Sequence, residues 1–164
     1  MKIFAPWFLF VVLIYVVQSS LLPTIGFNGV SADLMLLLTV SFSFLRGAKL
    51  GAMMGFLAGL LSDLATGTFF GIGIFSKMLI GFFCGMFSKR VFKEQMLLPL
   101  ISVLISTAAQ DLMTLIFIFL LGYRPNIFYH LHQLLLPTLF FNTVFALPVH
   151  YLVSKMCEWL RAKK

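Results

Sequence analysis

The chain has 164 residues, of which 61% are hydrophobic and 10% are charged, and its formal net charge is +7 at pH 7. Soluble domains usually have roughly a quarter of their residues charged, and a water-soluble fold of this size cannot bury so much apolar surface. The composition therefore excludes a soluble globular protein. It predicts an all-α, polytopic membrane protein with one integral membrane domain over residues 1–164.

Apolar segments follow one another along the chain, and each is close to the roughly 20 residues that a helix needs to cross the hydrocarbon core. They cover residues 4–22, 28–45, 47–66, 69–88, 96–121 and 133–157. These segments predict a six-transmembrane-helix bundle. The first segment has a lysine before it and Pro23 after it, which favours an uncleaved helix over a signal peptide.

Basic residues lie almost entirely at one set of segment ends. Arg124 lies in an outer connection and Lys77 within a segment, whereas the other ten share one side. These ten are Lys2, Arg46, Lys49, Lys89, Arg90, Lys93, Lys155, Arg161, Lys163 and Lys164. Because Lys and Arg are enriched in cytoplasmic loops, both termini are predicted to be cytoplasmic. Topology then explains the positive charge, and we expect membrane lipids as contacts but no nucleic acid.

Glycine recurs in steps of four residues in the third and fourth segments, with Asp63 and Lys77 each taking one position in the row. The positions are Gly47, Gly51, Gly55, Gly59 and Gly67 in or beside the third segment, and Gly73, Gly81 and Gly85 in the fourth. A step of four residues keeps these positions on one slowly turning side of a helix, and small residues let helices approach closely in lipid. The two rows either pack on each other within the chain or form a groove for a partner's transmembrane helix.

Polar residues inside the apolar segments predict a buried cluster, because charges at membrane depth usually face protein or water. The candidates are Asp33, Asp63, Lys77, Asp111 and Asn142. Their depth along the helices predicts that Lys77 pairs with Asp111 or Asp63, with Gln110 beside them. Such a cluster either fixes helix register or forms a substrate or proton site. We assign Asp63 a helix-positioning role.

The remaining polar residues give no sign of catalysis. His130 and His132 are expected at the outer interface, and His150 is expected to pack near the inner end of the last segment. Membrane aspartyl signal peptidases also use two intramembrane aspartates, but they place asparagines near these acids and have four spans. The sequence contains no metal-ligand spacing, no serine–histidine–acid grouping and no HExxH motif. We therefore expect no enzymatic activity, no metal and no cofactor.

One stretch carries a more specific pattern. From Ala32 to Gly71 it contains an acid-leucine start, an apolar segment and then a series of regularly spaced residues. The pattern consists of Asp33-Leu34, Arg46-Gly47, Gly51, Gly55-Phe56, Gly59-Leu60, Asp63-Leu64, Gly67 and Gly71. This pattern resembles the rod shape-determining protein MreD family. Members often have proline before the first acid, where this chain has Ala32.

The resemblance implies a non-enzymatic membrane scaffold of the bacterial cell-elongation machinery in the cytoplasmic (inner) membrane. Such proteins bind an MreC-type bitopic membrane protein. They work with RodA, a penicillin-binding transpeptidase and MreB to position lateral peptidoglycan synthesis and maintain rod shape. In this chain, a small-residue groove along the third segment would hold the partner's transmembrane helix.

The resemblance also implies a fold similar to the substrate-binding subunits of energy-coupling-factor transporters. This gives an alternative function, a vitamin-type substrate-binding subunit of a membrane transporter. Those subunits commonly carry an alanine patch on the first helix for docking, whereas the first segment here has the single alanine Ala5. That difference and the short outer connections favour the scaffold.

Overall fold

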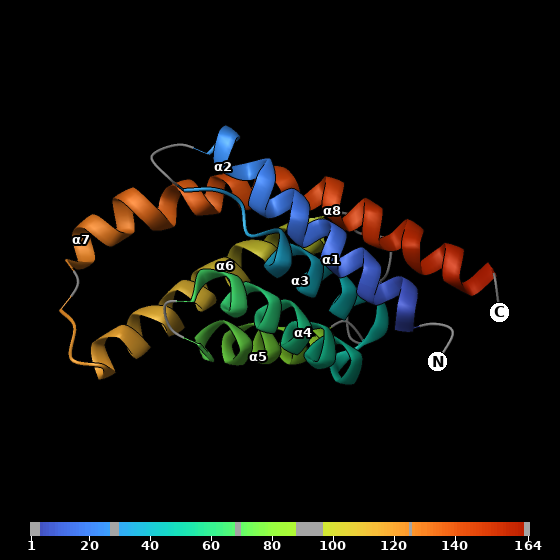
Figure 1. Cartoon of the computed structure of the whole chain (residues 1–164), viewed down its shortest axis with the longest axis horizontal. Helices are drawn as coiled ribbons and strands as arrows, with labels where there is room; N and C mark the ends of the chain where they lie inside the picture. Colours follow the sequence, from blue (N-terminus) through green and yellow to red (C-terminus); the bar gives the residue numbers. More distant parts are fainter. Residues whose placement is uncertain (1–3, 27–29, 68–69, 88–96, 125, 163–164) are drawn as a thin grey trace.

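The computed structural model describes residues 4–26, 30–67, 70–87, 97–124 and 126–162, and these residues are almost entirely helical (Figure 1). The elements are α1 (Phe4–Ser20), α2 (Leu22–Ile25), α3 (Leu34–Arg46), α4 (Ala48–Thr66), α5 (Ile72–Phe87), α6 (Leu97–Leu120), α7 (Ile127–His130), a π-helical turn η1 (Leu131–Leu135) and α8 (Leu136–Ala162). The last three form one continuous helical stretch, Ile127–Ala162.

Helix α3 forms the centre of the molecule. Every residue from Leu34 to Ser43 is buried, and α1, α4, α5, α6 and α8 all contact α3. A helix that is apolar all round is stable inside a core, provided that its polar atoms are satisfied. Thr39 donates its hydroxyl to the carbonyl of Met35, and Ser43 donates to the carbonyl of Thr39. Helix α3 is therefore buried in the core and does not form part of the outer surface.

The helices differ in whether they are long enough to cross a membrane. Within the described residues, the three that qualify by length and composition are Ala48–Thr66, Pro99–Leu120 and Ile127–Ala162. Three shorter apolar helices accompany them, namely Pro6–Ser20, Leu34–Arg46 and Ile72–Phe87. The structure thus has the expected all-helical membrane character. The expectation of six full-length spans stays a prediction.

The predicted start of the second segment is wrong. Helix α3 begins at Leu34, and residues 30–33 are not helical. The Oδ1 atom of Asp33 accepts a hydrogen bond of 3.0 Å from the Leu36 backbone N–H, so Asp33 is the N-cap of α3. Hydropathy could not locate this start, because buried non-helical residues such as Val30 and Ala32 are as apolar as helical ones.

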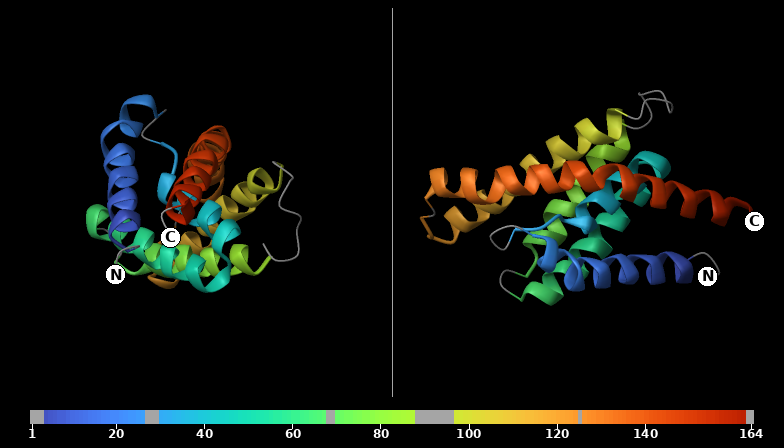
Figure 2. Two further views of the ribbon diagram at one scale, coloured as in Figure 1. Left: turned by 90° about the vertical axis from the view of Figure 1, so that its right-hand side faces the viewer. Right: turned by 90° about the horizontal axis from the view of Figure 1, so that it is seen from above.

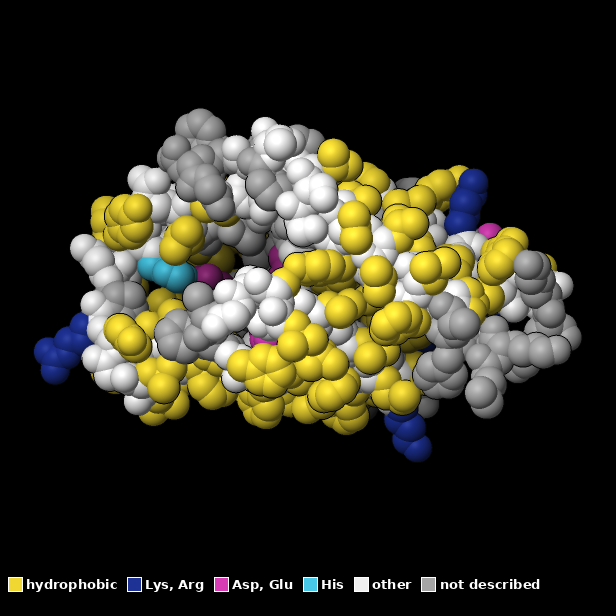
Figure 3. Space-filling view, viewed as in Figure 1, with side chains coloured by type: hydrophobic (Ala, Val, Ile, Leu, Met, Phe, Trp, Pro, Cys, Tyr) yellow, Lys and Arg dark blue, Asp and Glu magenta, His cyan; other side chains and the backbone are white. Residues whose placement is uncertain are grey.

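The outside of the bundle is apolar. Large side chains such as Leu9, Leu120, Phe128 and Phe140 are each more than 60% exposed. Figure 3 shows apolar side chains spread over the body of the molecule, while basic side chains project at the left end and in the right half of the view. Soluble monomers rarely expose apolar side chains over most of their surface. This surface is therefore suited to contact lipid tails.

Both termini lie at the same end of the bundle, together with the α3–α4 connection at Gly47 (Figures 1 and 2). The α6–α7 connection, which carries Arg124, lies at the opposite end. This arrangement fits the predicted topology, in which the termini share one side. Several basic residues used in that prediction lie outside the described residues, namely Lys2, Lys89, Arg90, Lys93, Lys163 and Lys164.

Candidate functional site

Asp33 lies at the centre of a buried polar network. Its Oδ2 atom accepts from Lys77 Nζ of α5 at 2.9 Å and from Gln110 Nε2 of α6 at 2.9 Å. The Lys77 side chain is 5% exposed and that of Asp33 is 18% exposed. A charge pair that is so largely buried is tolerated only with good geometry and further hydrogen bonds. Because Asp33 also caps α3, one carboxylate connects three helices.

Asn142 of α8 completes the network from the other side. Its Oδ1 atom accepts from the Asp33 backbone N–H at 2.8 Å, and its Nδ2 donates to Thr107 Oγ1 of α6 at 2.9 Å. Asn142 is fully buried, and Thr107 in turn donates to the carbonyl of Val103. An amide that donates and accepts in this way fixes the position of α8 against α3 and α6.

Helix α1 joins the network through Gln18, whose Oε1 atom accepts from the Met35 backbone N–H at 3.0 Å. Sequence reasoning missed both Gln18 and Thr107. For Gln18 the available signal was a polar side chain near the end of an otherwise apolar segment, where unsatisfied backbone N–H groups of a neighbouring helix need acceptors. Thr107 lies in the middle of its segment, and its contact with the Asn142 side chain has no comparable signal in the sequence. Gln110, in contrast, lies in the cluster as expected.

The expected pairing of Lys77 with Asp63 is wrong. The Asp63 Oδ2 atom accepts from the backbone N–H groups of Gly71 at 2.8 Å and Ile74 at 3.1 Å. These donors lie at the start of α5, where a carboxylate satisfies free N–H groups and the positive end of the helix dipole. Asp63 therefore fixes the end of α4 to the start of α5, which is the helix-positioning role expected for it.

The expected pairing of Lys77 with Asp111 is also wrong, because Asp111 pairs with His130. The His130 Nε2 atom lies 2.9 Å from Asp111 Oδ1 and 3.1 Å from Oδ2. The two side chains are 13% exposed for His130 and 22% exposed for Asp111. Figure 3 shows a histidine beside an acidic side chain in a hollow of the surface. His130 of α7 therefore contacts α6, and its predicted place at the outer interface stays a prediction.

The glycine rows of α4 and α5 face each other. A Cβ atom added at Gly59 would lie 2.5 Å from the Ile74 Cα atom, and one at Gly55 would collide with the Lys77 carbonyl. The facing pairs are Gly51 with Gly81, Gly55 with Lys77, Gly59 with Ile74, Gly73 with Asp63, and Gly85 with Ala48. We call these five pairs the α4–α5 seam. Because α5 fills this row, the expectation that the same row holds a partner's helix is wrong.

Gly47 and Gly67 have a different role from the one predicted. A Cβ atom at either position would meet nothing within 4 Å, so close packing against a neighbouring helix does not require glycine at either position. Gly47 has φ 87° and separates α3 from α4, whereas Gly67 has φ 63° and ends α4 in the left-handed conformation. Glycine adopts positive φ at little cost, which explains its presence at both turns.

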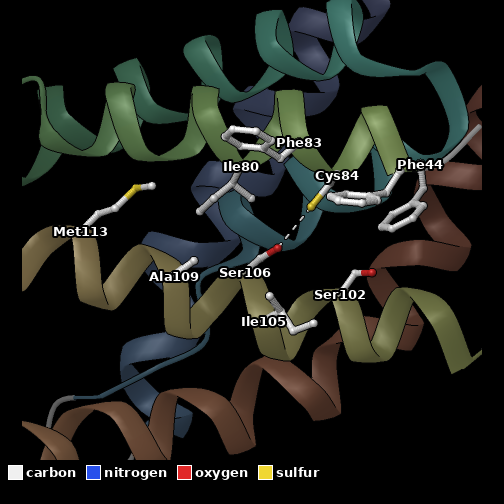
Figure 4. Close-up of a pocket in the computed structure, with 10 residues that line it drawn as sticks. Phe44, Ile80, Phe83, Cys84, Ser102, Ile105, Ser106, Ala109 and Met113 are labelled. Carbon is white, nitrogen blue, oxygen red and sulfur yellow. Dashed lines mark hydrogen bonds between the residues drawn. The ribbon is translucent and has the colours of Figure 1, made fainter.

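Two apolar grooves open on the surface of the bundle. One lies between α5 and α6, has a volume of about 330 Å³ and is shown in Figure 4. Cys84 and Ser106 meet across it with their Sγ and Oγ atoms 3.3 Å apart. The other groove lies between α1 and α4, with a volume of about 860 Å³. Both are lined mainly by hydrocarbon, as expected of surfaces that face lipid tails.

An apolar exterior encloses a hydrogen-bonded polar centre in this bundle. These features define the class of helical integral membrane proteins. The sequence model of one family, described as rod shape-determining protein MreD, matches residues 1–160. The chain belongs to the MreD family, and its role lies in rod shape determination. The corresponding comparisons found no match among curated proteins or solved structures. The expected likeness in fold to energy-coupling-factor subunits stays a prediction.

Proposed function

We propose that the chain is a non-enzymatic, multi-pass scaffold of the cell-elongation machinery in the bacterial cytoplasmic membrane. The match of residues 1–160 to the MreD family carries this proposal. The chain binds an MreC-type bitopic partner and thereby positions lateral peptidoglycan synthesis. RodA, a penicillin-binding transpeptidase and MreB act in the same machinery.

The buried polar network supports a scaffold. A scaffold must hold a partner at a fixed height and orientation, and this requires helices that do not slide past each other. Asp33 and Asn142 tie α3, α5, α6 and α8 together at one level of the bundle. Shifting any of these helices by one turn would leave buried polar atoms unpaired, at a cost of about 1–3 kcal/mol for each group.

The α4–α5 seam revises the docking mechanism that the sequence suggested. Small residues in that seam serve contact between two helices of the chain itself. A partner's transmembrane helix would therefore pack on the lipid-facing surface of the bundle, where large apolar side chains are exposed. Helix association in lipid depends on packing complementarity, which such a surface can supply.

Two experiments test the scaffold in its native host. In the first, the native copy is depleted and a tagged copy is supplied, and we expect the tagged copy to restore rod shape. In the second, the tagged protein is purified in mild detergent, and we expect an MreC-type protein to co-elute. An unrelated tagged membrane protein of similar size is the control. Round cells despite normal accumulation of the tagged protein would contradict the proposal.

A small-molecule carrier is the second candidate, and one observation favours it. The Asp111–His130 pair is mostly buried, and the Oε1 atom of Gln110, the residue before Asp111, is buried without a hydrogen-bond partner among the described residues. A ligand could use these polar groups for orientation. Nanomolar retention of a vitamin that is lost in Asp111→Asn would replace the scaffold with this function.

A further inference from the structure

The groove between α1 and α4 combines an apolar interior with a charged end. Helix α1 stands at one edge of the bundle (Figure 2). It is held to α3 by an edge-to-face contact between the Trp7 and Phe42 rings, with centroids 4.6 Å apart. The resulting groove of about 860 Å³ is lined in part by Trp7, Val11, Phe42, Leu50, Met53 and Phe56. Its apolar lining suits a hydrocarbon chain.

Arg46 is the one charged residue among those that line this groove in the described part of the chain. Its Nε atom is buried and has no hydrogen-bond partner among the described residues. Leaving a buried donor of a charged group unpaired is costly, so an acceptor that reaches Arg46 would bind favourably. The groove therefore ends at a cation with one buried N–H group that has no partner among the described residues.

Lys49 adds a second positive charge at the same end. It is exposed in the first turn of α4, and Met53 and Phe56 follow it at spacings of four and seven residues. These spacings place Lys49 on the same face of α4 as the two groove residues. No side chain in the described part of the chain caps the start of α4, whose helix dipole is positive there. An anion bound at this end would contact Arg46 and Lys49 and would be stabilised by the positive end of the α4 dipole.

The position of the basic end fits a lipid headgroup. Arg46 and Lys49 flank the α3–α4 connection, at the end of the bundle that carries both termini (Figure 1). Basic residues at the ends of apolar helices lie at headgroup height, and the apolar part of the groove then lies at the depth of the acyl chains. Basic pockets between transmembrane helices are known to bind anionic headgroups.

We propose that the α1–α4 groove is a binding site for one anionic phospholipid. The phosphate of the lipid is bound by Arg46 and Lys49, and an acyl chain lies along Trp7, Met53 and Phe56. Charge complementarity favours this occupant over a partner's transmembrane helix. A helix would fill the apolar part of the groove, but its own apolar side chains would not satisfy Arg46.

Trp7 provides a direct readout of the groove, since the chain has only one other tryptophan, Trp159. The full chain with Trp159→Phe is reconstituted into nanodiscs with increasing fractions of brominated phosphatidylglycerol or brominated phosphatidylcholine. Bromine quenches tryptophan fluorescence on contact, so quenching reports an acyl chain beside Trp7. We expect half-maximal quenching at a fraction of phosphatidylglycerol several times lower than that of phosphatidylcholine.

Charge-removing variants test the basic end. Arg46→Gln should weaken the preference for phosphatidylglycerol by about fivefold, as expected for one basic residue near a membrane surface. Lys49→Gln should weaken it in the same direction, and this exposed position keeps the test valid if Arg46→Gln fails to fold. The matched control is Arg124→Gln at the opposite end, which should leave the preference unchanged.

Two results would overturn the proposal. Equal quenching by the two lipids at every fraction would show that the groove does not select an anionic lipid. Displacement of both lipids by the transmembrane segment of an MreC-type partner, independent of lipid charge, would show that a helix is the occupant. Neither result would affect the proposed scaffold function, which is tested by cell shape and co-purification.

Discussion

At the scale of single residues, Asp33 connects several helices through its side chain and its backbone. Its carboxylate caps α3 through Leu36 and neutralises Lys77, and its backbone N–H is bound by Asn142. A charged residue in the membrane interior needs such partners, because no water replaces a missing one. The acid at the start of α3 is therefore explained by the lysine that enters from α5.

Replacing Lys77 with methionine tests this pairing. The change leaves the Asp33 carboxylate buried with only neutral partners, and breaking a buried ion pair from one side costs about 3–5 kcal/mol. We expect Lys77→Met to lower both the yield of monodisperse protein and its midpoint of thermal unfolding. Size-exclusion chromatography and a thermal melt in detergent measure these quantities.

A double variant and a surface control complete the experiment. Asp33→Asn combined with Lys77→Met removes both charges and should recover part of the lost stability. Lys155→Met, at an exposed position of α8, should change the yield little. Normal yield of Lys77→Met together with a loss of rod shape would show that the pair has a functional role beyond stability.

At the scale of elements, close contact between α4 and α5 replaces side-chain interdigitation. The backbone of α5 lies against the glycines of α4, so both helices use their lack of side chains to gain van der Waals contact. Asp63 binds the first turn of α5 and fixes the register of the pair. The two helices therefore behave as one packed hairpin against α3.

A bulky residue in the α4–α5 seam should break this hairpin. A leucine at Gly55 would collide with the Lys77 carbonyl, and because this obstacle is backbone, the two helices would have to separate. We expect Gly55→Leu to abolish accumulation of folded protein, as judged by the same chromatography. The matched control is Ala65→Leu at an exposed position of α4, which should accumulate normally. A well-folded Gly55→Leu that lost only its MreC-type partner would instead place the partner in the seam.

At the scale of the whole molecule, the ends of the chain and the α6–α7 connection lie on opposite sides of the bundle. This separation agrees with the strong bias of basic residues toward one side in the sequence. If the bundle crosses the membrane as proposed, Arg124 faces the outside and Lys49 faces the cytoplasm.

Cysteine labelling tests this topology. In a background of Cys84→Ser and Cys157→Ala, a membrane-impermeant maleimide is added to spheroplasts. We expect Arg124→Cys to be labelled at once, whereas Lys49→Cys should react only after the membrane is permeabilised. Both positions are exposed, so access to the reagent is decided by the membrane alone. The opposite labelling pattern would invert the predicted orientation.

Features that depend on composition and on position along a helix could be predicted from the sequence. It predicted an all-helical membrane protein and placed the ends of α4 and α6 to within a residue or two. It also identified the MreD family from residues near Asp33 and along α4, a prediction confirmed by the match over residues 1–160. These features follow from local hydropathy, spacing and charge, which neighbours in space do not alter.

The contacts between polar residues could not be predicted in this way and became clear from the folded structure. Depth along a helix put Lys77, Asp111 and Asn142 at one level, but depth carries no information about rotation around the helix axis. That rotation joins Lys77 to Asp33 and turns Asp111 toward His130. The same reason applies to the glycines, since only the packing of α5 against α4 shows that their row is already filled. Contacts between helices depend on the orientation of both partners, and that orientation is a property of the folded chain.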